Sequence, residues 1–254
     1  MYGRYERDKR LVTVVVPCYN EAGNIRKVIQ GFHSSELVKE AFDFDILVVD
    51  NNSTDNTAKV ARRAGARVIH EPRQGKGYAM RTGFRNIHPK AAYVVMLDGD
   101  DTYRPDEVLR LLEPLHHNFC DVVIGSRLGG KMYDNSMRLG NRGFNWLCVH
   151  IVRIFYRANV TDVLSGYYAW KRDVVTRLLP HLDASGFSLE MEMVTKMAKM
   201  SCDVYSVPIS YHRRVSGSGI SPLDSIPILR MFITNLFWKP RQERYTAQES
   251  TATS

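Results

Sequence analysis

The chain has 254 residues, 44% of them hydrophobic, and carries 35 Lys or Arg against 27 Asp or Glu, a net charge of +8. This length can bury the core of one large α/β domain, and the basic balance favours anionic partners such as phosphorylated metabolites, nucleic acid or a membrane face. The four cysteines show neither CxxC pairing nor zinc-finger spacing. The composition therefore excludes a disulfide framework and predicts four reduced thiols in a cytosolic protein.

Apolar runs alternate with helical patterns over the first half of the chain. Expected strands cover 11–17, 44–50, 66–70, 93–98 and 121–127, and expected helices cover 20–32, 54–66, 75–87 and 104–115. Because the strands are continuously apolar, both faces of their sheet are expected to be covered. This alternation predicts an α/β fold with a doubly wound, mostly parallel sheet and helices on both faces.

The pattern changes after Arg127. Helical patterns cover 138–158 and 189–200, and 203–214 resembles a strand. From Arg127 to Arg177 there are nine Lys or Arg against three Asp, a local charge of +6. Five apolar side chains in this region can face lipid or pack in the core, and the core is favoured: Trp146, Leu147, Ile151, Ile154 and Phe155.

The C-terminal apolar segment, 225–238, is too short to span a bilayer. It suits an amphipathic helix lying on a membrane, and packing on the core is an equal alternative. No other run reaches the roughly 18 apolar residues that a spanning helix needs. The expected organisation is a main domain over 1–223, an apolar or amphipathic helix over 224–240 and a disordered tail over 241–254.

Polar residues end the apolar runs. Ligands of open α/β sheets bind beyond the carboxyl ends of the strands, so these residues are candidate site residues. The first strand ends in PCYNE and not in GxGxxG, which argues against a dinucleotide-binding oxidoreductase. Asp50 can accept hydrogen bonds from a ribose or a base, whereas 53–55 are expected to cap the next helix. Lys76 lies between two glycines at a helix start, where it can meet phosphate.

Three carboxylates, Asp98, Asp100 and Asp101, follow the fourth expected strand. In extended backbone, Asp98 and Asp100 share a face, and Gly99 allows a close approach of the backbone. Such a cluster is costly unless a cation or hydrogen bonds compensate it. Two hard carboxylates suit Mg²⁺ or Mn²⁺ shared with substrate phosphates, and an Asx-type turn is the alternative.

Seven segments between residues 11 and 214 form a specific set when taken together: VVVPCYNEAGNI, VVDNNSTDNT, GKGYAMRTGF, LDGDD, IGSR, LGNRGFN and DVLSGYYAWKR. This set resembles a family 2 glycosyltransferase of the GT-A fold. Within that family it resembles the dolichyl- or polyprenyl-phosphate sugar synthases. The resemblance implies a GT-A domain that moves a hexose, with inversion, from GDP-mannose or a UDP-sugar to a polyprenyl or dolichyl phosphate, with Mg²⁺ or Mn²⁺ at the DxD motif.

The resemblance also implies roles for individual residues. The nucleotide sugar would be bound by Pro17, Tyr19, Glu21, Asp50, Lys76, Asp98, Gly99 and Arg214. The metal ligands would be Asp98 and Asp100, and the acceptor phosphate would be received by Arg127, Arg142 and, as a third, Arg138. Two positions depart from the family pattern: Thr102 stands where Gln is frequent, and Gly219 where Lys is frequent. The first departure leaves the further ligands of the metal undefined, and the second removes one expected phosphate contact.

The implied reaction takes place at the cytoplasmic face of a membrane, to which the chain would bind peripherally or through a membrane-protein partner. The second ionisation of a lipid phosphate has a pKa of about 6, so this acceptor is largely deprotonated at neutral pH and needs no protein base. A transferase acting on a soluble hydroxyl would need one, and Asp162, Glu190 and Glu192 are candidates. A nucleic-acid-binding module would explain the charge, but the acidic cluster and the absence of a nucleic-acid motif argue against it.

Overall fold

A computed structural model describes residues 9–34, 36–133, 136–213 and 221–240. Its centre is a seven-stranded sheet with the order β3-β2-β1-β4-β6-β5-β7. The strands are β1 (Arg10–Cys18), β2 (Phe42–Asp50), β3 (Arg67–His70), β4 (Tyr93–Leu97), β5 (Val122–Ser126), β6 (Tyr167–Lys171) and β7 (Val204–Pro208). Only β6 runs antiparallel to its neighbours, so the doubly wound, mostly parallel sheet is confirmed.

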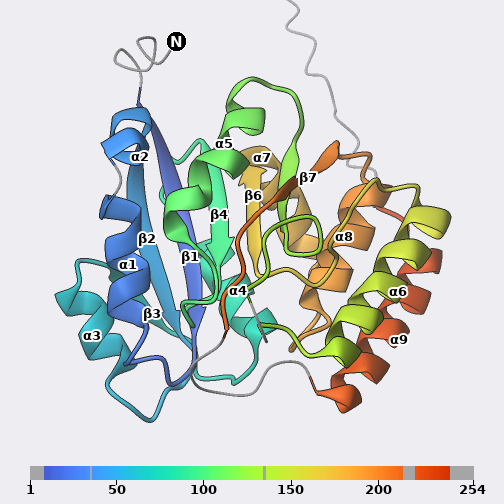
Figure 1. Ribbon diagram of the computed structural model, residues 1–254, viewed down its shortest axis with the longest axis horizontal. Coiled ribbons are helices and arrows are strands. Elements are labelled where there is room, and N and C mark those ends of the chain that lie inside the picture. The colour runs from blue at the N-terminus through green and yellow to red at the C-terminus, as the bar shows by residue number, and fades with distance from the viewer. Residues whose placement is uncertain (1–8, 35, 134–135, 214–220, 241–254) are drawn as a thin grey trace, which may run out of the picture.

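Helices cover both faces of the sheet (Figure 1). They are α1 (Ile25–Ser34), α2 (Glu36–Ala41), α3 (Thr57–Arg63), α4 (Lys76–Arg85), α5 (Val108–His116), α6 (Leu139–Tyr156), α7 (Arg172–Leu178), α8 (Leu189–Lys199) and α9 (Ser225–Phe237). Short 3-10 turns occupy Pro105–Glu107, Leu179–His181 and Pro222–Asp224. Core side chains of α1, α2, α3 and α5 pack on one face, and those of α4 and α6 to α9 pack on the other.

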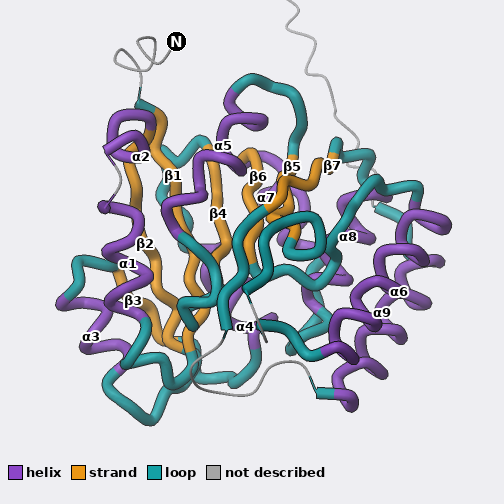
Figure 2. The backbone as a smooth tube through the Cα atoms, in the orientation of Figure 1, coloured by secondary structure: helices purple, strands orange, loops and turns teal. Residues whose placement is uncertain are grey.

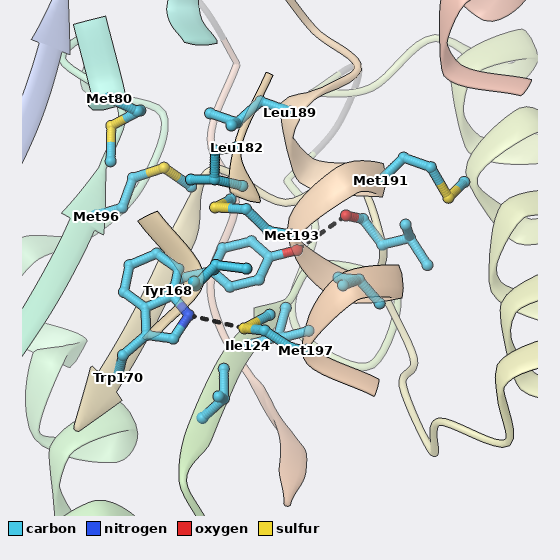
Figure 3. Close-up of a cluster of buried hydrophobic side chains, with 14 of the residues drawn as sticks. Met80, Met96, Ile124, Tyr168, Trp170, Leu182, Leu189, Met191, Met193 and Met197 are labelled. Carbon is cyan, nitrogen blue, oxygen red and sulfur yellow. Dashed lines mark hydrogen bonds between the residues drawn. The ribbon is translucent and has the colours of Figure 1, made fainter. Parts of the chain in front are cut away.

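Side chains of the continuously apolar strands pack in two separate cores, one on each face of the sheet, as two-sided burial requires. Val14 and Val16 of β1 point to the core under α1 and α5, and Val15 points to the opposite core. Figure 3 shows part of that opposite core, where methionines of several elements surround Tyr168 and Trp170. The polar atoms of these two rings are satisfied: Trp170 Nε1 donates to Met197 Sδ at 3.2 Å, and Tyr168 Oη to the Val163 carbonyl at 2.9 Å.

Several element boundaries differ from the sequence expectation. Strand β6 and helix α2 were not predicted, because each is short and joins a neighbouring helix without a polar turn. Strand β4 ends at Leu97, so Asp98 begins a turn and the extended geometry expected for the acidic cluster is wrong. The strand-like stretch beginning at 203 ends at Pro208. The four cysteines are buried and unbridged, as predicted.

The apolar side chains of α6 correct another expectation. Trp146, Leu147, Ile154 and Phe155 are exposed and do not lie in the core, whereas Ile151 is half-buried. The helix packs through its opposite side, which carries Cys148, Val149, Val152 and Tyr156.

Helix α9 packs beside α6 and α8. Tyr156 Oη donates to the Phe232 carbonyl at 2.8 Å, and Asn235 Nδ2 donates to Thr195 Oγ1 at 2.8 Å. Within the described ranges, no helix combines the length and hydropathy needed to cross a bilayer. The predicted division at residue 224 stays a prediction, and the tail over 241–254 lies outside the described residues.

Candidate active site

The loops after β1 and β2 are tied together at the carboxyl edge of the sheet. Asn20, with φ of 56°, donates its backbone N–H to Ser53 Oγ at 3.0 Å, and its side-chain oxygen accepts the Thr54 N–H at 2.8 Å. The expected capping role falls to Asp55, whose carboxylate accepts the Thr57 N–H at 2.9 Å at the start of α3. Ser53 and Thr54 instead join the two loops.

The end of β2 is joined in turn to the loop that precedes α4. Asp50 is buried; its carboxylate accepts the Ser53 N–H at 3.4 Å and lies 3.3 Å from His70 Nδ1. Asn51 donates to the Arg73 carbonyl at 2.7 Å, and its oxygen accepts the Gly75 N–H at 2.7 Å. Sequence reasoning missed Asn51, although it directly follows the predicted ligand Asp50.

Four of the predicted site carboxylates affect the pKa of the Cys18 thiol. Burial raises the pKa of this thiol well above its usual range, and the negative charges of Glu21, Asp50, Asp100 and Asp98 raise it further. Gly99 is what lets the turn approach β1, since a Cβ at this position would lie 2.5 Å from Cys18 Sγ. The turn that holds Asp98 and Asp100 thus lies against the end of β1, and we call this part of the sheet the acidic edge. The roles predicted for these carboxylates stay predictions.

Lys76 provides the counter-charge for Asp98. Its Nζ lies 2.6 Å from Asp98 Oδ1 and 2.6 Å from Glu190 Oε1, a carboxylate in the first turn of α8. Burial alone would lower the pKa of Lys76, but the two carboxylates raise it above its ordinary value, so the ammonium stays charged. Burial raises the pKa of Glu190, and Lys76 only partly offsets this effect.

Asp98 is also held by a glycine that sequence reasoning did not single out as a site residue. A Cβ at Gly166 would lie 2.0 Å from Asp98 Oδ2, so only glycine fits beside this carboxylate. The Gly166 carbonyl accepts the Asp98 N–H at 3.2 Å, and the Gly166 N–H donates to Tyr103 Oη at 2.7 Å. The segment SGYY, quoted above only for its resemblance, contains this glycine.

The other two aspartates of the turn have different environments. Asp100 is buried, and its Oδ1 accepts the Thr102 Oγ1 hydroxyl at 2.6 Å and the Thr102 N–H at 3.1 Å. Thr102 therefore orients Asp100 directly. Asp101 adopts a φ of 61° and forms an ion pair with Lys27. The described residues contain no cluster of three or more His, Cys, Asp or Glu side chains suited to a metal ion.

A second buried ion pair on α8 supports the same region. The Glu192 carboxylate accepts the N–H groups of Asp183 and Ala184, both at 2.9 Å, and lies 2.7 Å from Lys196 Nζ. The neighbouring Ser185 carbonyl accepts the Gly77 N–H at 3.0 Å, next to Lys76. Glu192 therefore fixes the loop on which the first turn of α4 rests.

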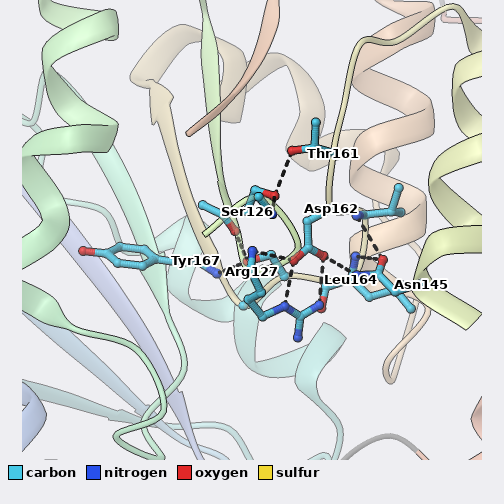
Figure 4. Close-up of polar contacts among 12 residues, drawn as sticks. Ser126, Arg127, Asn145, Thr161, Asp162, Leu164 and Tyr167 are labelled. Carbon is cyan, nitrogen blue, oxygen red and sulfur yellow. Dashed lines mark hydrogen bonds and ion pairs between the residues drawn. The ribbon is translucent and has the colours of Figure 1, made fainter. Parts of the chain in front are cut away.

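Arg127, directly after β5, forms a forked ion pair with Asp162 (Figure 4). Arg127 Nε and Nη2 lie 2.8 and 2.9 Å from the two Asp162 oxygens, and Nη2 also donates to the Leu164 carbonyl at 2.5 Å. Asn145 of α6 donates to Asp162 Oδ1 at 2.6 Å. Burial would lower the pKa of Arg127, but Asp162 raises it, so the guanidinium remains charged.

The three predicted acceptor arginines do not share one environment. Arg127 is buried, whereas Arg138 and Arg142 are exposed at the beginning of α6, where the Arg142 N–H donates to the Arg138 carbonyl at 3.0 Å. Asn145, one turn further along α6, connects this region to the Arg127 pair.

A short segment after β7 links the acidic turn to the loop before α6. The His212 N–H donates to the Thr102 carbonyl at 2.8 Å, and the Tyr211 N–H donates to the Lys131 carbonyl at 2.9 Å. Among the described residues, His212 Nε2 is a buried side-chain atom without a hydrogen-bond partner. The predicted donor ligand Arg214 and the departing position Gly219 lie outside the described residues.

Of the remaining predicted nucleotide ligands, Pro17 lies in β1 and is half-buried, and Glu21 follows in the next loop. Tyr19 is 46% exposed and available to a ligand at the sheet edge. The assignment of individual residues to nucleoside, metal and acceptor phosphate stays a prediction.

A mixed sheet with an acidic turn at its carboxyl edge and helices on both faces is a GT-A-type α/β fold. The family model for glycosyl transferase family 2 matches residues 13–179, and the chain belongs to this family.

Curated relatives agree with this assignment. The chain is 35% identical over 207 residues to glycosyltransferase AglJ of Haloferax volcanii, covering 82% of this chain and 65% of the relative. It is 28% identical over 216 residues to undecaprenyl-phosphate mannosyltransferase of Micrococcus luteus, covering 81% and 85%. It thus spans slightly less than two thirds of AglJ, and 50% of hexosyltransferase Agl6 of the same archaeon.

Among solved structures, the fold resembles glucosyl-3-phosphoglycerate synthase from Mycobacterium tuberculosis in complex with Mn²⁺, uridine diphosphate and phosphoglyceric acid. The TM-score is 0.71 at 24% identity, covering 93% of this chain and 83% of that one. This likeness supports the GT-A-type fold.

Proposed function

We propose that this protein transfers a hexose, with inversion, from a nucleotide-diphosphate sugar to a polyprenyl-type lipid phosphate at a cytoplasmic membrane surface. The observation that carries the proposal is that all three candidate general bases are buried in ion pairs. Asp162, Glu190 and Glu192 are buried, and each is held in an ion pair. A phosphate acceptor needs no such base, and the relative from Micrococcus luteus is named for a lipid phosphate.

The donor half of the proposal uses the acidic edge. Tyr19 is exposed to the nucleoside, Asp50 lies buried at the end of β2 beside it, and Asp98 and Asp100 offer the hard oxygen donors that Mg²⁺ and Mn²⁺ prefer. A bound divalent ion would neutralise the developing charge of the leaving diphosphate. Lys76 and Thr102 hold the two carboxylates in place before the donor arrives, which limits reorganisation during the reaction.

The acceptor half uses the cations along β5 and α6. Arg127 engages Asp162 through Nε and Nη2, and its Nη1 forms no hydrogen bond within the described ranges. Arg142 presents a second guanidinium at the exposed start of α6. A phosphate held here attacks the anomeric carbon, the bond from that carbon to the diphosphate oxygen breaks, and the configuration inverts. The role of these side chains is to bind and orient the nucleophile.

A soluble hydroxyl acceptor is the second candidate. Two observations favour it: burial raises the pKa of Glu190 towards the range of a general base, and the structural neighbour is named for phosphoglycerate. Against it, Glu190 is held in an ion pair, with its Oε1 2.6 Å from Lys76 Nζ.

The two candidates predict different mutant kinetics with a short-chain polyprenyl phosphate. Arg142→Ala should raise KM for this acceptor at least about tenfold with little change in KM for the donor, because a charge-assisted phosphate contact is lost. Arg62→Ala, which removes an exposed arginine from α3, is the control and should behave like wild type.

The Glu190→Gln variant shows whether Glu190 acts as a general base or only holds Lys76 in place. If Glu190 only supports Lys76, the variant keeps measurable transfer at every pH, with a weakened donor affinity. Loss of transfer in Glu190→Gln together with an unchanged acceptor KM in Arg142→Ala would replace the lipid-phosphate proposal with the soluble-hydroxyl one.

A further inference from the structure

Two neighbouring helices, α6 and α9, present apolar side chains to solvent on the outer side of the molecule. On α6 the exposed apolar residues are Leu139, Trp146, Leu147, Ile154 and Phe155. At about 100° per residue, the first four lie within roughly 100° of one another around the helix, and Phe155 lies further round, where its ring meets Phe232 of α9. Trp146 is 58% exposed. These side chains belong to a helix that is otherwise well packed, so their exposure does not come from an unsupported segment.

Helix α9 repeats this arrangement. Ile226, Ile233 and Phe237 are exposed at spacings of seven and four residues, and Phe237 is 81% exposed. Figures 1 and 2 show α6 and α9 side by side, and the rings of Phe155 and Phe232 meet at 5.5 Å. We call the exposed apolar residues of the two helices the α6–α9 face.

Charge indicates what covers this face. Neither helix contains a single Asp or Glu. Exposed cations lie on or beside both helices: Arg138, Arg142, Arg153, Arg157, Arg230 and Lys239. Among the described residues, these six cations on or beside the two helices outnumber the one carboxylate that directly flanks either helix, Asp224, the N-cap residue of α9. Apolar side chains with such an excess of cations match the interface of an anionic bilayer, where acyl chains receive the apolar groups and headgroups receive the cations. A second copy of the same chain would oppose these cations with identical cations, which disfavours self-association through this face.

We propose that the α6–α9 face docks on an anionic lipid bilayer and thereby presents the start of α6 to lipid substrates. The inference rests on the proposed function for its purpose, because only a membrane-embedded acceptor requires this orientation. The arrangement of the α6–α9 face itself does not depend on the proposed function. Asn145 of α6 binds Asp162, the partner of Arg127, so docking through α6 holds the sheet edge close to the headgroups.

Deleting α9 is a poor test, because Tyr156 and Thr195 would lose their hydrogen-bond partners on this helix. Surface substitutions avoid this problem. The test variant is Trp146→Ser with Ile154→Ser on α6 and Phe237→Ser on α9. The control is Phe119→Ser, which removes an aromatic side chain that is 64% exposed outside the α6–α9 face and contacts Tyr205.

Flotation is measured with phosphatidylglycerol-containing vesicles and with phosphatidylcholine vesicles, without donor or acceptor. Wild type and the Phe119→Ser control should bind the anionic vesicles at least tenfold more strongly than the neutral ones, and added salt should weaken binding. The triple variant should lose at least tenfold in anionic binding while keeping its circular dichroism spectrum. Its transfer rate to a water-soluble, short-chain lipid phosphate should stay unchanged.

Equal vesicle binding by wild type and the folded triple variant would overturn the docking proposal, as would wild type that dimerises and binds no vesicles. If vesicle binding requires the α6–α9 face but the enzyme accepts only soluble hydroxyls, the docking proposal stands and the proposed function is wrong. The two failures are therefore distinguishable.

Discussion

The carboxyl edge of the sheet that we assign to the donor, called here the donor edge, differs from the α6–α9 face in burial and in charge. At the donor edge, carboxylates are partly or fully buried, and Asp98, Asp100 and Glu190 each have a defined partner within 2.6 Å. On the α6–α9 face, apolar side chains and arginines are exposed on helices that lack carboxylates. A pre-organised edge is sensitive to single atoms, whereas a docking surface depends on total apolar area and charge. Substitutions in the two regions should therefore differ in size and in additivity.

Asp100→Asn should have the largest effect on transfer, roughly 10³-fold or more, because transition-state charge on the leaving diphosphate would lose several kcal/mol of stabilisation. Binding of the nucleoside diphosphate should weaken when Mn²⁺ is present and change little in EDTA. Asp101→Asn, in the same turn but paired with exposed Lys27, is the matched control and should retain most activity. Wild type that binds and turns over equally well in EDTA would contradict the metal assignment.

Arg127→Ala should reduce the free energy of unfolding by about 3–5 kcal/mol, because it leaves the buried Asp162 carboxylate without its main cation. Chemical denaturation measures this loss. The double variant Arg127→Ala with Asp162→Asn should recover part of it, since no buried charge is then left unpaired. A folded Arg127→Ala protein of wild-type stability would show that this pair is not structural.

The Gly166→Ala variant tests whether transfer depends on the exact position of the Asp98 carboxylate. Its Cβ would collide with the Asp98 carboxylate, and a displacement of about 1 Å at a catalytic group can cost ~10²-fold in rate. The fold should survive, so thermal unfolding should change much less than transfer. Gly143→Ala is the control, because a Cβ there meets nothing within 4 Å. Similar activities for the two variants would indicate that Asp98 can move without consequence.

The smallest effect concerns acid stability. A hydrogen bond from Arg73 lowers the pKa of Glu71 from 4.5 to about 2; burial opposes this shift, and the Thr82 hydroxyl adds to it. Because the pKa is lower in the folded state, this stabilisation is complete above pH 4.5 and is lost as the pH falls towards 2. The stability difference between wild type and Glu71→Gln should shrink over that interval in urea denaturation. A difference independent of pH would contradict the shift.

The sequence predicted the sheet, its two covered faces and the polar residues at its strand ends, because buried strands and strand-terminal acids leave local patterns. It did not predict that Lys76 pairs with Asp98, or that Asp162 pairs with Arg127, because these partners are 22 and 35 residues apart and no local pattern joins them. Gly166 was missed as a support for Asp98 for the same reason. Trp146 and Ile154 were misplaced in the core, because hydrophobicity alone does not distinguish a buried helix face from an exposed one.

The most direct test of the proposed function is the release of nucleoside diphosphate from GDP-mannose and UDP-sugars in Mn²⁺, with three acceptor conditions. These are no acceptor, a polyprenyl phosphate and 3-phosphoglycerate. The account predicts that release from one donor is accelerated by the polyprenyl phosphate alone and that the product is a glycosylated lipid phosphate. Acceleration by 3-phosphoglycerate, with none by the lipid phosphate, would contradict it.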